Sequence, residues 1–229
     1  SDSLMALCAG ASLWMYARDR TRWATVFAGL AMLSKETAVV LPALFLLYNY
    51  VYQGTLSSRE SIRGKPYTPA YFAILPVALL TAGYLALSWS WGLLDGAGNR
   101  AGRGWETHLW TQAVALRQYA LALIWPLRWG IEGTLAGTVG PTVVGIGSPV
   151  LAAVSGWWAW QKKGAWLFLW GAFWLALLPV LLMPLNILTA DRRLYWPGMF
   201  LCIGGGIMMA NLERRLGKPL IIGGVAVLI

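Results

Sequence analysis

Runs of apolar residues, separated by short basic gaps, constrain this chain more than any other feature. The clearest runs cover residues 3–17, 68–91, 148–160, 165–184 and 195–211, and a partial run starts at 219. Several of them approach the ~20 residues that a helix needs to cross a hydrocarbon core about 30 Å thick. Only 12% of the 229 residues are charged, about half the share in a soluble domain. We therefore predict an all-α fold, a polytopic transmembrane helix bundle.

The net charge of +9 fits this fold class, because Lys and Arg concentrate in the cytoplasmic loops of membrane proteins. For that reason we do not expect nucleic acid as a partner. Cys8 and Cys202 lie inside apolar runs and are expected to be small core residues rather than a disulfide or a metal pair. His108 has no partner at metal-ligand spacing, so we predict neither a metal site nor a cofactor.

The segment LAMLSKETAVVLP, residues 30–42, interrupts an apolar run with polar and charged residues. Residues 23–52 can form one long helix or two short helices that meet at 34–36. A single crossing would place the basic residues of 18–22 and 59–65 on opposite sides, whereas a hairpin places them on one side, as the positive-inside rule favours. We predict the hairpin. Its first arm would be only about 18 Å long, so its turn should lie in the outer leaflet or be lined by protein.

Residues 108–127 carry a narrow polar stripe on an otherwise apolar helix, formed by His108, Thr111, Gln112, Ala115 and Gln118. This pattern is typical of an interfacial helix, and a crossing helix is the alternative. If the segment does not cross, the cytoplasmic loops hold eleven of the eighteen basic residues, whereas a crossing would divide them nine and nine. We adopt the non-crossing topology. The eleven are Arg18, Arg20, Arg22, Arg59, Arg63, Lys65, Lys162, Lys163, Arg214, Arg215 and Lys218.

The other seven basic residues lie on the opposite side: Lys35, Arg100, Arg103, Arg117, Arg128, Arg192 and Arg193. The four arginines from 100 to 128 are explained as loop or interfacial charges that reach water. Lys35 cannot be explained in this way, because a Lys deep in a membrane helix costs about 2.5–3.5 kcal/mol to insert and usually faces a partner or a cavity. An ion pair with Glu36 is a poor alternative, since neighbouring side chains on a helix point about 100° apart.

The segment TADRRLYWPG, residues 189–198, places charged residues directly before an aromatic pair: Asp191, Arg192, Arg193, Tyr195 and Trp196. Two interpretations stay open. The aromatic pair can belong to an interfacial belt, with the arginines on lipid headgroups. Alternatively, the arginines bind phosphate through their planar fork. On the same face as Lys35, they would then hold an anionic headgroup at the membrane surface.

Four blocks of the sequence, in this order and spacing, resemble one family. They are SDSLMAL, LAMLSKETAVVLPALFLLYNY, LRQYALALIWPLRWGIEG and LLPVLLMPLNILTADRRLYWPGM, and together they span roughly residues 2–200. The combination of SKE before a proline-bearing helix with RRLYWP after PLN is fairly specific. The chain resembles the GT-C membrane glycosyltransferases, which take a sugar from a polyprenyl-phosphate donor. It is most similar to the transmembrane-and-tetratricopeptide protein O-mannosyltransferases and their bacterial relatives.

The resemblance implies an integral membrane protein of the bacterial inner membrane, or an equivalent membrane, whose active site faces the extracytoplasmic side. A lipid-linked sugar is the implied donor, and a protein is the implied acceptor. The donor phosphate would be held by a basic residue in the helix turn, assisted by an arginine of the later block: Lys35, with Arg192 or Arg193. Three further residues would surround it: Glu36, Asp191 and Tyr195.

The catalytic carboxylate of that class lies in the first outer loop, ahead of the helix that begins SDSLMAL, and the repeats of the family would follow residue 229. We therefore expect residues 1–229 to be part of one transmembrane domain, truncated at both ends. The catalytic residue stays unknown. Five acidic residues lie on the correct side, and none of them is favoured over the missing loop: Asp2, Asp95, Glu106, Glu132 and Asp191. Asp2 is expected to be a polar residue at a helix start.

Two other classes of function remain open. A non-catalytic scaffold, or an accessory subunit of a larger membrane complex, would fit the fifteen tryptophans. A transporter would carry interrupted helices in an inverted repeat, and the sequence shows only one interrupted pair. The transporter is therefore the weakest of the three.

Overall fold

The computed structural model describes residues 2–62, 70–92, 112–113, 115–116, 119, 143–182 and 194–216. Within these residues the chain is helical and contains no strand, which confirms the predicted all-α class. Three helices lie within two residues of the predicted runs 3–17, 68–91 and 165–184, whereas the helix of the run 148–160 begins five residues earlier and that of 195–211 ends five residues later. The elements are α1 (Asp2–Ala17), α2 (Thr21–Ser34), the 3-10 helix η1 (Glu36–Val40), α3 (Leu41–Ile62), α4 (Ala70–Ser90), α7 (Val143–Lys162), α8 (Gly164–Leu182) and α9 (Tyr195–Leu216).

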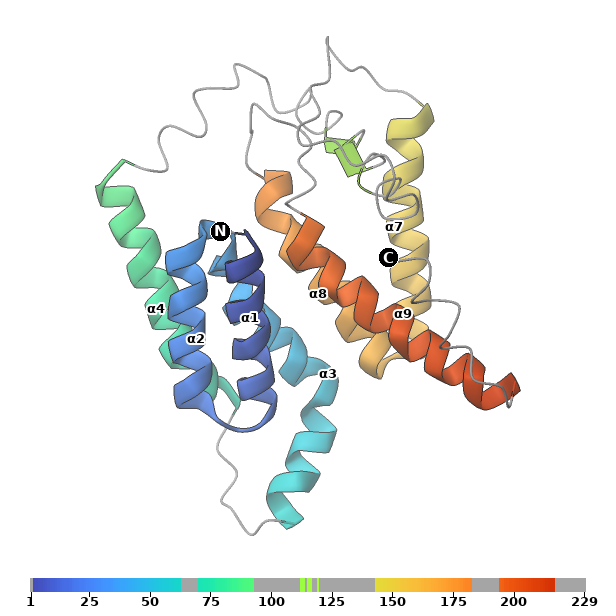
Figure 1. Cartoon of the computed structure of the whole chain (residues 1–229), viewed down its shortest axis with the longest axis horizontal. Helices are drawn as coiled ribbons and strands as arrows, with labels where there is room; N and C mark the ends of the chain where they lie inside the picture. The colour runs from blue at the N-terminus through green and yellow to red at the C-terminus, as the bar shows by residue number, and fades with distance from the viewer. Residues whose placement is uncertain are drawn as a thin grey trace.

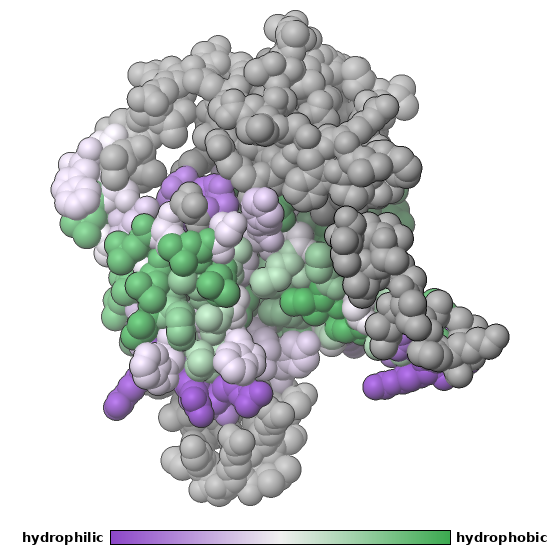
Figure 2. Space-filling view, in the orientation of Figure 1, coloured by the Kyte–Doolittle hydropathy of each residue, from purple (hydrophilic) through white to green (hydrophobic). Residues whose placement is uncertain are grey.

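Consecutive helices run in alternating directions between two ends of the molecule (Figure 1). The upper end in that view holds the start of α1, the junction of α2 with η1, and the start of α9. The lower end holds the turns between α1 and α2 and between α7 and α8. The basic residues of these turns and of the last turn of α9 therefore gather at the lower end: Arg18, Arg20, Lys162, Lys163, Arg214 and Arg215. Figure 2 shows hydrophilic atoms along this end, below a hydrophobic band.

The predicted break at 34–36 is confirmed. Helix α2 ends at Ser34, whose Oγ donates to the Leu30 carbonyl over 2.7 Å, and such bonds compete with helix geometry. Pro42 stands in the first turn of α3, where its missing N–H is tolerated, whereas in a continuous helix its ring would clash with the preceding turn. Helix α3 then runs back toward the lower end (Figure 1). Residues 21–62 thus form the predicted hairpin.

Helices α1 and α2 approach closely because small residues fill their contact. Ala9, Ala28 and Ala31 are fully buried, as is Ser12, and Ala24 is almost so. The Ser12 Oγ donates to the Ala24 carbonyl over 2.7 Å across the contact. Small side chains and interhelical hydrogen bonds are what pack helices where lipid replaces water. The pairing of α1 with α2 therefore follows from their sequence.

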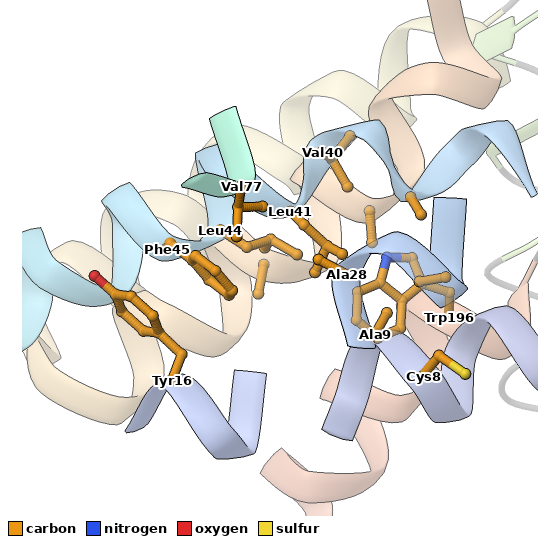
Figure 3. Close-up of a cluster of buried hydrophobic side chains, with 14 of the residues drawn as sticks. Cys8, Ala9, Tyr16, Ala28, Val40, Leu41, Leu44, Phe45, Val77 and Trp196 are labelled. Atoms are coloured by element: carbon orange, nitrogen blue, oxygen red, sulfur yellow. The ribbon is translucent and has the colours of Figure 1, made fainter. Parts of the chain in front are cut away.

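Larger side chains from α1, α3, α4 and α9 form one buried cluster (Figure 3). Tyr16 stacks on Phe45, with ring centroids 4.1 Å apart, and the Asn49 Nδ2 donates to the Tyr16 hydroxyl over 2.7 Å. Trp196 lies toward the other end of the cluster, beside Ala9 (Figure 3). The cluster connects the hairpin to α1 and α9.

The two cysteines differ from each other. Cys8 is buried in the cluster, as predicted, and both thiols are free. The expectation of a core position is wrong for Cys202, which is exposed on α9. Among the described helices α9 packs mainly on α8 and α1, so much of its remaining surface stays open.

The predicted interfacial helix, 108–127, lies mostly outside the described residues. Its described residues are helical, and Gln112 of the polar stripe is buried. Ala115 and Tyr119 pack against Leu177 of α8. This part of the segment therefore contacts protein, while the rest of the stripe lies outside the described residues.

By length and composition alone, one helix in the described part of the chain is apolar enough to cross a membrane, over Gly164–Leu181. Two other apolar stretches, Glu36–Tyr52 and Ile74–Ser90, are shorter. The number of crossings stays a prediction.

Candidate functional site

Lys35 lies at the break between α2 and η1. Its backbone is extended, with φ of −164° and ψ of 141°, so the side chain does not continue the surface of either helix. Only 19% of the side chain is exposed, and its Nζ donates to the Asp2 Oδ1. The charge that the sequence places inside an apolar run is therefore paired, as its burial requires.

Asp2 comes from a helix that is distant in sequence. It lies in the first turn of α1, as expected for a polar residue at a helix start, and 11% of its side chain is exposed. A carboxylate there is also favoured by the helix dipole. The ion pair with Glu36 is not formed, because the ammonium turns to Asp2 and Glu36 is exposed.

The lengths of two helices bring this pair together. Helix α1 has 16 residues and α2 has 14, which correspond to about 24 and 21 Å at 1.5 Å per residue. Because the two helices run antiparallel and meet at a short turn, the start of α1 and the end of α2 lie level. The turn is short because Asp19 adopts a φ of 60°, a left-handed conformation that Asp tolerates better than most residues.

The pair leaves capacity for a further ligand. A lysine ammonium has three donors, and the contact with the Asp2 Oδ1 uses one of them. Lys35 stands at the junction of α2 with η1, which lies at the end of the molecule opposite the basic turns (Figure 1). An anion that arrives at that end can therefore interact with the ammonium without separating α1 from α2.

Two buried polar groups near this end were not predicted. The Thr37 hydroxyl and the Trp196 indole N–H are buried and have no hydrogen-bond partner among the described residues. Thr37 was visible in the sequence as another polar residue of the same run. The burial of Trp196, which is 2% exposed, depends on how α9 packs on α1. The interfacial-belt interpretation is therefore wrong for Trp196.

The structure places three of the six predicted site residues: Lys35, Glu36 and Tyr195. Tyr195 is half-exposed in the first turn of α9, which begins at the same end of the molecule as Lys35 (Figure 1). Asp191, Arg192 and Arg193 lie outside the described residues, so their predicted approach to Lys35 stays a prediction.

In the part of the chain that the structure describes, no three His, Cys, Asp or Glu side chains could hold a metal ion together. Among the described residues, this end holds hydrogen-bond donors and two carboxylates. The donors are the paired Lys35 ammonium and the buried Thr37 hydroxyl and Trp196 indole N–H. The carboxylates are Asp2, which accepts from Lys35, and the exposed Glu36. The donors suit an anionic or oxygen-rich ligand, whereas the two carboxylates repel an anion, so an anionic ligand here depends on Lys35. Known protein families, curated proteins and solved structures offer no match to this chain.

Proposed function

We propose that this chain belongs to a polytopic membrane glycosyltransferase that moves a sugar from a polyprenyl-phosphate donor to an extracytoplasmic acceptor, with protein as the expected acceptor. The observation that carries the proposal is Lys35, a paired but accessible ammonium at a helix break. The resemblance of the four sequence blocks to the GT-C enzymes supports the same assignment.

The membrane location is supported by large apolar side chains on the outer surface of several helices. The exposed fraction reaches 70% for Leu7, 82% for Leu33 and 71% for Leu151, and hydrophobic residues form a band on the visible face (Figure 2). Soluble monomers rarely expose contiguous apolar patches beyond a few hundred Å². Lipid around the helices accounts for these side chains, including those of helices shorter than a full crossing.

The distribution of basic residues supports an extracytoplasmic position for the site. The basic turns lie at one end of the helices and Lys35 lies at the other (Figure 1). If the basic end is cytoplasmic, Lys35 faces the outer side. The positive-inside rule does not explain a lysine there. Asp2 balances its charge, and an anionic headgroup is the further partner that the proposal assigns to it.

Sugar transfer breaks the bond between the anomeric carbon and a phosphate oxygen and leaves an anionic polyprenyl phosphate. A preorganised ammonium stabilises the charge that develops on this leaving group. Among the described residues, Lys35 uses one of its three donors, on Asp2, and Arg192 or Arg193 would add a second cation. The acceptor hydroxyl requires a general base, and no residue of this chain is assigned to that role.

The ion pair also favours a second function. Because Asp2 and Lys35 join α1 to the helix break, the lysine can be purely structural, as in a non-catalytic scaffold of a larger membrane complex. In that case its removal would lower stability without affecting any sugar transfer by the protein that remains folded.

A transfer assay on the intact protein separates the two functions. At limiting donor, we expect Lys35→Ala to lower kcat/KM at least about tenfold, since the loss of one charge-stabilising donor typically costs 10²–10³ in rate. Lys35→Arg should retain part of the activity, and Lys162→Ala, at the basic end, is the matched control. Full activity of folded Lys35→Ala protein would reject the proposal.

A further inference from the structure

A groove lies between α2 and α4, away from the Lys35 pair. Its volume is about 560 Å³, and apolar side chains line most of it, among them Leu30, Leu33, Pro76 and Leu80. Volumes of this size are typical of small-ligand sites. The groove is open along its length rather than enclosed, so a molecule can enter it sideways from the surroundings of the helices.

The groove exists because a glycine stands at its centre. A Cβ atom at Gly29 would lie 3.8 Å from the methyl groups of Leu80, at ordinary contact distance. A side chain longer than alanine there would therefore occupy the space. Leu30 and Leu33, which are 46% and 82% exposed, stand beside this gap on the surface of α2.

The two ends of the groove differ in charge. Thr21 and Arg22 line one end, and Arg22 is the only charged residue among the described residues of the lining. This end belongs to the basic end of the molecule, next to Arg18 and Arg20 in sequence. Leu33 lines the opposite end. Among the described residues that line the groove, an anionic group therefore finds its cationic partner at the Arg22 end.

The length of the groove indicates which kind of ligand fits it. Twelve residue steps separate Thr21 from Leu33, which corresponds to about 18 Å along the helix. One leaflet of a hydrocarbon core is about 15 Å thick. The α2 side of the groove thus has the length of one acyl chain in one leaflet, and Pro76 and Leu80 of α4 line the other side. A guanidinium stands where the headgroup phosphate of that lipid would lie.

We propose that this groove binds an anionic phospholipid of the leaflet at the basic end, with the phosphate on Arg22 and one acyl chain along Gly29. The site is distinct from the proposed donor site, because Lys35 lies near the Leu33 end. The inference rests on the proposed membrane location but not on sugar transfer. It assigns the α2–α4 surface a lipid that stabilises the two helices against each other.

Native mass spectrometry of the intact protein tests this inference, with phosphatidylglycerol and phosphatidylcholine as probes. We expect the wild type to retain phosphatidylglycerol in preference to phosphatidylcholine. Arg22→Gln should lower that preference about five- to tenfold, whereas Gly29→Leu should reduce binding of both lipids. Arg214→Gln is the matched control at the same end, outside the groove, and should bind as the wild type does.

Because Arg22 is exposed, Arg22→Gln should leave the folding of the protein unchanged. The test therefore does not depend on Gly29→Leu, which alters a helix contact. Unchanged lipid retention in both variants, or no retained lipid in the wild type, would overturn the inference. The assay contains no sugar donor, so its failure is separate from a failure of sugar transfer.

Discussion

At the scale of single residues, the pair of Asp2 and Lys35 combines a structural and a chemical role. A buried charge without a partner is expensive, whereas a paired one contributes little net stability and fixes one arrangement of its surroundings. Here the pair fixes where α1 begins relative to the end of α2. It also keeps an ammonium at a defined place near the surface of one end, which is what a phosphate site requires.

Removal of either partner should destabilise the protein. For Asp2→Asn we expect the free energy of unfolding to fall by about 1–3 kcal/mol, less than for a fully buried pair because both side chains retain some exposure. Unfolding in detergent, followed as a function of denaturant concentration, measures this change in the free energy of unfolding. The double variant Asp2→Asn with Lys35→Met should recover part of the loss, because it leaves no unpaired charge; strictly additive losses would show that the two groups do not interact.

Sequence reasoning found one half of this pair. Lys35 stands out because its cost in an apolar run is high and its neighbour Glu36 points elsewhere. Asp2 could be placed at a helix start but not against Lys35, since that contact requires the antiparallel packing of α1 and α2. The burial of the Thr37 hydroxyl and the Trp196 indole N–H, which have no hydrogen-bond partner in the part of the chain that the structure describes, depends on tertiary packing in the same way.

At the scale of elements, the helix break was the most informative prediction. The positive-inside argument and the polar residues at 34–36 both indicated a hairpin, and Ser34 and Pro42 supply its local causes. Helix bounds were predictable because apolar runs and polar gaps alternate clearly. The contacts of α3 with α8 and of α1 with α9 could not be predicted, since almost every helix here offers apolar residues on all sides.

The contact of α7 with α8 allows a direct test of packing. A Cβ atom at Gly156 would lie 2.6 Å from the Trp170 ring, and a rigid ring has little freedom to move away. We expect Gly156→Ala to lower the free energy of unfolding by about 1–2 kcal/mol, because overpacking exceeds the gain in helix propensity.

Gly83→Ala in α4 is the matched control, because a Cβ atom there meets nothing within 4 Å. It should stabilise the protein by about 0.5–1 kcal/mol. Thermal unfolding of both variants in the same detergent gives the comparison. If Gly156→Ala proved as stable as Gly83→Ala, the described contact of α7 with α8 would be wrong.

At the scale of the whole molecule, the two ends differ in their content of basic residues. The alternating helices bring the basic turns together at one end and the Lys35 break to the other (Figure 1). The sequence predicted this separation from positions of Lys and Arg alone. Which end faces the cytoplasm follows only if the chain lies in a membrane, and that is open to a labelling experiment.

Cysteine labelling with an impermeant thiol reagent checks the orientation. In protein with Cys8 and Cys202 replaced by serine, Glu36→Cys should react from the extracytoplasmic side of sealed vesicles. Arg20→Cys should react only from the cytoplasmic side, since it stands in the turn between α1 and α2. Reaction of both positions from one side would contradict the proposed topology.

The most direct test of the central claim, that Lys35 holds the donor phosphate, is the affinity of the purified intact protein for polyprenyl phosphate. We expect Lys35→Gln to weaken binding about tenfold, the loss of one charged hydrogen bond, and Lys35→Arg to retain most of it. Asp2→Asn should bind at least as tightly as the wild type, because the competing carboxylate is removed, even though it is less stable. Equal affinities for the wild type and folded Lys35→Gln protein would contradict the claim and leave the ion pair a purely structural role.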